Sequence, residues 1–114
     1  MADGCEKEHD PRRCDAAIAH AFGFLGKRWN GVLLSVLISG PASFTELRRA
    51  VAGISDSVLS ERLSELSKAG LVQRSVDEGP PVSVTYQLTP SGQGLLPALT
   101  ELSTWARDNM PSKS

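Results

Sequence analysis

The chain has 114 residues and a net charge of −1, with 40% hydrophobic and 22% charged residues. These values are typical of one globular domain with a single hydrophobic core, and the length excludes two ordinary domains. No apolar run reaches the roughly 18 residues of a membrane-spanning helix, and the N-terminus lacks the apolar segment of a signal peptide. We therefore expect a cytoplasmic protein with no membrane partner, in which two cysteines serve as thiols or ligands rather than as a disulfide.

Charge is distributed unevenly along the chain. Between Lys27 and Arg74 there are seven basic and four acidic residues, whereas the two ends and the pair Asp77 and Glu78 carry the excess of negative charge. A basic middle favours an anionic partner such as nucleic acid.

The predicted domain occupies residues 11–110, after an acidic tail at residues 1–10 and before a short tail at 111–114. Asp10 and the proline after it fit the start of a first helix, and Gly26 fits its end. The next helix, over about residues 30–39, is apolar on nearly every side. That pattern predicts a position in the middle of the core.

Two further helices are predicted on either side of a short turn. Ser43 with Glu46 fits a capping box, with Thr45 as the alternative cap, and this helix ends near position 51. Ser55 then caps a longer helix that Gly70 ends. This order is that of a helix-turn-helix.

Two β-prone segments follow at residues 71–76 and 83–88, separated by a Gly-Pro-Pro turn. A last helix is predicted from Thr89, with Pro97 either tolerated in its first turns or producing a kink. The whole pattern predicts a mainly α fold with a small β-hairpin wing, which is a winged helix-turn-helix.

The second helix of the helix-turn-helix has an apolar stripe on one side and serines on the other. Short hydroxyls allow close approach to base edges in a major groove and can donate or accept a hydrogen bond. The candidates for base contacts are Ser55, Ser57, Ser60, Glu61 and Ser64. The candidates for phosphate contacts are Lys27, Arg28, Arg48, Arg49, Arg62, Lys68 and Arg74. Two alternatives stay open: the serine face is merely solvated, and Arg62 is a structural salt-bridge partner.

Seven short motifs follow one another in order: GKRW at 26–29, SFTELRR at 43–49, GIS at 53–55, VLSERLSEL at 58–66, AGLV at 69–72, PP at 80–81 and YQLT at 86–89. Together they resemble the HxlR-type bacterial transcription regulators, over residues 14–105. The resemblance implies a winged-helix homodimer, built from the first and last helices, that binds a roughly palindromic DNA operator. We expect it to act as a repressor, with an activator as the open alternative. Because no catalytic motif is recognisable in the sequence, we expect the protein not to be an enzyme, and no cofactor is expected.

The wing departs from the family pattern. Family members often carry an arginine directly after the two prolines, whereas Val82 and Ser83 stand there in this chain, and Asp77 and Glu78 precede the turn. A wing without basic residues is expected to make weaker phosphate contacts.

Apolar residues of the first and last helices are the candidates for the dimer interface: Phe22, Phe24, Leu99, Leu102 and Trp105. Phe22 and Phe24 cannot share one face of a helix, so one of them is expected to face the partner subunit. The alternative for the aromatic residues is a pocket for a small-molecule inducer.

The N-terminal cysteines are candidates for redox sensing. HxlR-type proteins resembling this one include thiol-based sensors of electrophiles, quinones or oxidants. Cys14 follows two arginines near a predicted helix N-terminus, and both features favour the reactive thiolate, with Cys5 as a second site. The alternatives are two unreactive thiols, or a ligand-responsive regulator without redox sensing.

No catalytic or metal motif accompanies these features. The spacing of Cys5, His9, Cys14 and His20 fits no zinc pattern. No phosphate loop, nucleophile elbow or zinc-protease motif is present in the sequence. The function that competes with DNA binding is a winged-helix module that docks to another protein.

Overall fold

The computed structural model describes residues 15–110, and the chain divides into two compact units after Gly31. The first unit contains helix α1 (Ala16–Leu25), which Asp15 caps by accepting the backbone N–H of Ala17 at 2.8 Å, and which Gly26 ends. The predicted cap Asp10 lies outside the described residues. The predicted start of this helix is nevertheless wrong, because the backbone at the cap is extended and the helical turns begin only after it.

The core of the second unit is formed by helices α2 (Asn30–Leu37), α3 (Phe44–Ala50) and α4 (Asp56–Lys68) together with the first and last residues of the hairpin. The buried apolar side chains are Leu33, Leu34, Leu37, Leu47, Val51, Ile54, Leu59, Leu63, Leu66, Val72 and Leu88. The sequence predicted that this helix lies in the middle of the core, but α2 is not buried on every side, since Val32 is half exposed. The helix packs through one stripe of leucines, and its remaining apolar residues are only partly covered.

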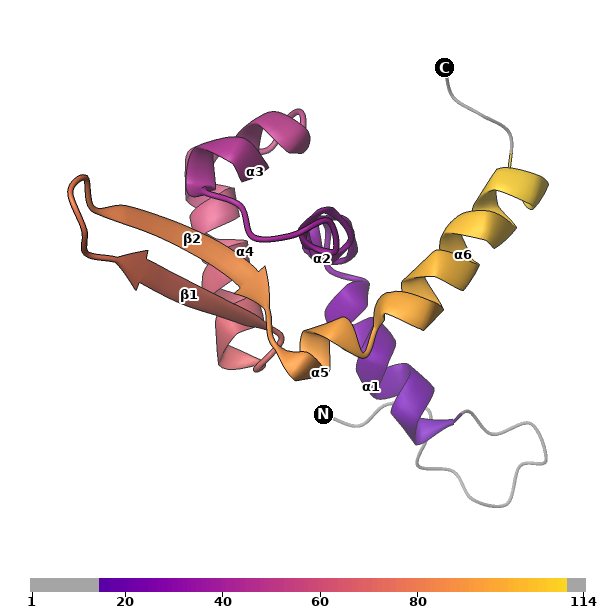
Figure 1. Ribbon diagram of the computed structural model, residues 1–114. Helices are drawn as coiled ribbons and strands as arrows, with labels where there is room; N and C mark the ends of the chain where they lie inside the picture. Colours follow the sequence, from indigo (N-terminus) through magenta and orange to yellow (C-terminus); the bar gives the residue numbers. More distant parts are fainter. Residues whose placement is uncertain (1–14, 111–114) are drawn as a thin grey trace. The chain divides into compact units, whose positions relative to one another are not determined.

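The hairpin consists of the antiparallel strands β1 (Val72–Asp77) and β2 (Ser83–Leu88), in register from Val72 opposite Leu88 to Asp77 opposite Ser83. Strand β1 contacts α4, and β2 contacts α3 (Figure 1). Ala42 and Tyr86 exchange two backbone hydrogen bonds of 3.0 and 2.8 Å, which join β2 to the segment before α3. The wing is thereby fixed against the helix-turn-helix.

Side-chain caps determine where the two helices of the helix-turn-helix begin. Ser43 Oγ accepts the N–H of Glu46 at 3.1 Å, while Glu46 Oε1 accepts the N–H of Ser43 at 2.8 Å. The capping box is therefore confirmed and Thr45 is not the cap. Ser55 Oγ accepts the N–H of Val58 at 3.2 Å, and Gly70 follows α4 with a φ of 80° that only glycine adopts without strain.

The last predicted helix is two helices, α5 (Pro90–Gln93) and α6 (Leu96–Asn109). Thr89 caps α5 as predicted, since its Oγ1 accepts the N–H of Gly92 at 3.1 Å. The helix is interrupted before Pro97 because a proline lacks the N–H that a continuous helix would use there. Pro97 lies instead in the first turn of α6, where that N–H is not needed.

Candidate nucleic-acid interface

Helix α4 separates an apolar face from a hydroxyl-rich face. The leucines Leu59, Leu63 and Leu66 are at most 2% exposed, whereas Ser57, Ser60, Glu61 and Ser64 are all exposed. Their exposure follows from the helical period, which turns these residues away from the leucine stripe. The structure thus brings four of the five base-side candidates to one accessible surface.

The fifth base-side candidate has a second role. Ser55 uses its hydroxyl oxygen to cap α4, and the same oxygen lies 3.5 Å from Ser57 Oγ. Because this oxygen already accepts a hydrogen bond from the backbone, Ser55 can contact a ligand by donating its hydroxyl proton.

An open groove of about 320 Å³ lies between α4 and the hairpin. Its lining residues are Ser60, Leu63, Ser64, Ser67, Arg74 and Tyr86. The side chain of Arg74 extends from β1 and makes no hydrogen bond or ion pair with another described residue. A groove with hydroxyls on one wall and a guanidinium on the other can hold a phosphodiester chain.

Two groove residues were missed by the sequence analysis. Ser67 follows Ser60 by seven residues, so the two lie on the same side of α4, and the helical wheel contained that signal. Tyr86 lies opposite Arg74 in the strand register, and this pairing becomes visible only once the hairpin register is known.

Arg62 forms salt bridges, which the sequence analysis gave as the alternative to a phosphate contact. Its side chain is 10% exposed, with Nη1 at 3.1 Å from Glu65 Oε1 and Nη2 at 3.5 Å from Glu61 Oε2. A guanidinium that is largely buried and paired with two carboxylates of its own helix is poorly placed to reach a phosphate.

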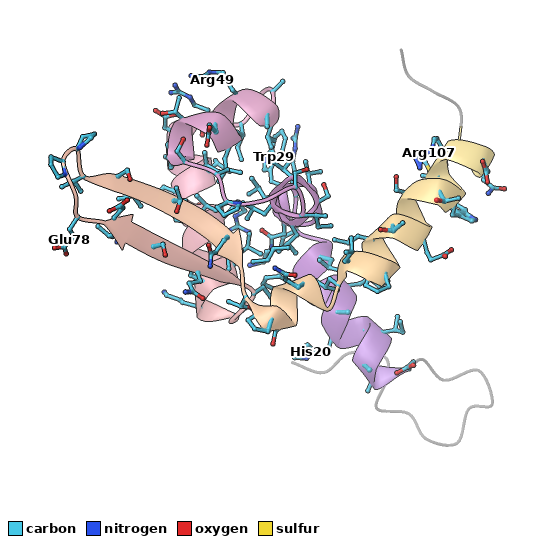
Figure 2. All side chains as sticks on the ribbon, in the orientation of Figure 1. His20, Trp29, Arg49, Glu78 and Arg107 are labelled. Carbon is cyan, nitrogen blue, oxygen red and sulfur yellow. The ribbon has the colours of Figure 1, made fainter. Side chains whose placement is uncertain are left out.

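The other phosphate candidates of the second unit are exposed. Arg48 forms an ion pair with Asp56 at 2.9 Å, from the end of α3 to the first turn of α4. The side chains of Arg49 and Lys68 have no hydrogen bond or ion pair to a described residue, and Figure 2 shows Arg49 projecting from the outer side of α3. The labelled Glu78 marks the acidic tip of the wing.

Lys27 and Arg28 belong to the first unit. The guanidinium carbon of Arg28 lies 4.6 Å from the centroid of the Trp29 ring, a cation–π contact that occupies one face of the cation. Trp29 adopts a φ of 82°, and the next residue, Asn30, is fully buried and donates from Nδ2 to the Phe24 carbonyl at 3.0 Å. Trp29 itself is partly buried.

The candidates for a dimer interface leave apolar surface uncovered in this chain. Phe22 in α1, and Leu102 and Trp105 in α6, are each more than half exposed, whereas Phe24 and Leu99 are partly buried. Large exposed apolar side chains on two helices are typical of surfaces that contact another protein.

Cys5 and Cys14 lie outside the described residues. Within residues 15–110, no three side chains of His, Cys, Asp or Glu gather into a metal-binding group, and His20 lies alone on α1 (Figure 2). None of the helices in that range is long and apolar enough to cross a membrane.

A helix-turn-helix with an exposed polar second helix, followed by a two-stranded wing, defines the winged helix-turn-helix class of DNA-binding proteins. Residues 24–114 match the HxlR-like helix-turn-helix family, and the chain belongs to that family. The resemblance found in the sequence is confirmed. The protein is a helix-turn-helix transcriptional regulator, and its relatives are regulators rather than enzymes.

Two sequence relatives come from Bacillus subtilis. The chain is 43% identical to the HTH-type transcriptional regulator YodB over 86 residues, which cover 75% of this chain and 77% of YodB. It is 41% identical over 88 residues to the uncharacterized HTH-type transcriptional regulator YvaP, covering 77% and 82% of the two chains.

Solved structures of regulators share the fold. The reduced form of YodB from B. subtilis superposes with a TM-score of 0.77 at 38% identity, covering 85% of this chain and 95% of YodB. The oxidized form of the redox regulator HypR gives a TM-score of 0.77 at 30% identity, covering 84% and 99%. A quinone-bound structure of YodB gives 0.72 at 37% identity, covering 82% and 99%.

Proposed function

We propose that the protein is a sequence-specific repressor that binds its DNA operator as a homodimer and releases it when an N-terminal thiol is modified. The observation that carries the DNA-binding part is the exposed serine face of α4, positioned by Ser55 and the leucine stripe on the second helix of a winged helix-turn-helix. Such a helix enters the major groove with its polar face toward the bases.

The division of roles on this surface follows from reach and charge. Ser57, Ser60, Glu61 and Ser64 read base edges, because short side chains on an inserted helix meet donors and acceptors directly. Arg49, Lys68 and Arg74 hold phosphates, because they are exposed cations without a described partner. The acidic wing contributes little to the affinity.

In a homodimer, the contact between the two copies determines the spacing and angle of the two α4 helices on DNA. The exposed apolar side chains of α1 and α6 supply surface for a second copy, and Phe22, Leu102 and Trp105 are each more than half exposed. Two α4 helices then enter successive major grooves about 34 Å apart, and a change in their mutual angle weakens binding because both can no longer dock at once.

Thiol sensing is supported by the relatives and by the sequence around the cysteines. YodB has been solved in reduced, quinone-bound and diamide-treated forms, and HypR in reduced and oxidized forms. Cys14 follows Arg12 and Arg13, whose charges favour the thiolate. Cys5 supplies a second thiol that can form a disulfide within the dimer.

The DNA-binding proposal is tested by selecting from a random duplex pool with the purified, reduced protein. We expect enrichment of a roughly palindromic sequence, because two equivalent helices read equivalent half-sites. Binding to the enriched duplex should weaken steeply as salt rises, by about 0.9 log units per log unit of salt for each phosphate contacted. If no sequence is enriched and no duplex is retarded at low salt, the winged helix serves instead as a protein-docking module.

Replacing the cysteines separates sensing from DNA binding. We expect Cys14→Ser to bind the enriched duplex as the wild type does but to resist release by diamide or a quinone, because a hydroxyl cannot form the adduct or disulfide. Cys5→Ser tests the second thiol, and weaker release by diamide in that variant would mean that both cysteines take part in a disulfide. Wild-type release in both single variants and in the double variant would leave a regulator that responds to a small-molecule inducer without redox sensing. The measurement is the fraction of bound duplex against reagent concentration.

A further inference from the structure

The exposed ion pair between Arg48 and Asp56 joins the last turn of α3 to the first turn of α4. Arg48 Nη1 lies 2.9 Å from Asp56 Oδ1 and 3.3 Å from Oδ2, and both side chains stay exposed, at 46% and 63%. An ion pair this exposed contributes little to stability. Its effect on an approaching polyanion is larger, since it cancels a cation that a phosphate would otherwise use.

The loss of the Arg48 charge matters because the helix-turn-helix and the wing contain few available cations. Between Ser43 and Leu88 there are five basic and six acidic residues, so the DNA-facing segment carries no excess of positive charge. Arg62 is buried between two glutamates, and Arg48 is paired with Asp56. The exposed cations without a described partner in this segment are Arg49, Lys68 and Arg74.

We infer that Asp56 limits the sequence-independent affinity of this protein for DNA by occupying Arg48. The carboxylate is held in place from two sides: by Arg48 and by its position in the first turn of α4, where a negative charge is favourable. A phosphate that approaches Arg48 must displace this carboxylate or bind beside it. Phosphate contacts supply almost all of the affinity for DNA of arbitrary sequence, so neutralising one cation acts directly on that affinity.

The inference rests on the proposed DNA-binding function and is tested with a scrambled duplex of fixed length, titrated at several salt concentrations. We expect Asp56→Asn to bind this duplex roughly three- to tenfold more tightly at low salt, with a salt slope steeper by about 0.9. In an Arg48→Gln background the same substitution should change the affinity by less than about twofold, because the cation that it releases is gone. Asp108→Asn, the same change on exposed α6, should leave the affinity unchanged.

Three results would overturn the inference: equal or weaker binding by Asp56→Asn, an equal gain in the Arg48→Gln background, or an equal gain from Asp108→Asn. Weaker binding would mean that Asp56 orients Arg48 toward the phosphate. Circular dichroism checks that each variant is folded, and Asp56→Ser repeats the test with a side chain that suits a helix N-terminus. If the wild type enriches a palindrome but these variants all bind alike, only the role of Asp56 is wrong; if it enriches nothing, the DNA-binding function fails.

Discussion

Ser64→Asp is expected to weaken binding to the selected operator by about 2–3 kcal/mol, or roughly 30- to 150-fold. Ser64 lies on the exposed face of α4 and lines the groove between that helix and the hairpin. A carboxylate there would face base acceptors and phosphates without a donor to pair with, and would lose its hydration on binding. Serine and aspartate have similar helix propensities, so the fold should be retained. The measurement is a gel-shift or anisotropy titration against the enriched duplex.

The control for this prediction is Ser91→Asp, which makes the same chemical change at an exposed position in α5. The control protein should bind the operator within about twofold of the wild type, since one charge remote from the DNA is largely screened by salt. Wild-type affinity in Ser64→Asp would mean that this face of α4 points away from the DNA. The solvated-face alternative for the serines would then be correct.

Gly92→Ala is expected to lower the free energy of unfolding by about 2–3 kcal/mol, because the added methyl group would have no space between α5 and its neighbours. Gly92 is buried in α5, and a Cβ added to it would overlap the Leu71 carbonyl oxygen and lie 3.1 Å from Leu88 Cδ2. The Leu71 carbonyl cannot easily move away, since it accepts the Thr89 N–H at 3.0 Å. A chemical denaturation curve followed by circular dichroism, at fixed protein concentration, measures the loss.

Gly31→Ala is the matched control. A Cβ at Gly31 meets no atom within 4 Å, and the residue lies near the start of α2 with an ordinary helical backbone. Alanine there should change the stability by less than about 1 kcal/mol, with a small gain from the reduced entropy of the unfolded chain. Equal curves for Gly92→Ala and the wild type would show that α5 can shift away from Leu71 without cost.

Much of this architecture could be predicted because its signals are local. The caps Ser43 and Ser55, the stop at Gly70 and the strand at residues 83–88 were all predicted correctly. The caps and the helix stop depend on residues within three or four positions, and the strand follows from its run of β-prone residue types, so the local sequence contains the information. The same holds for the serine face of α4, which follows from the helical period alone.

The misplaced boundaries have a common origin. Both Asp10 and Asp15 suit a helix cap, and both Thr89 and Leu96 can begin a helix when a proline follows. Local signals of similar strength compete at these positions. The outcome depends on which turn the remainder of the chain supports.

By itself, the sequence determined the order of helices, turn and wing, the family, and the identity of the polar face on α4. The tertiary structure decided which charges are available on that face. Arg62 is buried between Glu61 and Glu65, and Arg48 is paired with a carboxylate eight residues away. The physical reason is that a charge's role depends on the partners and the solvent around it, which residue type does not specify. Backbone approaches such as that of Gly92 to Leu71 are likewise determined by packing between distant segments.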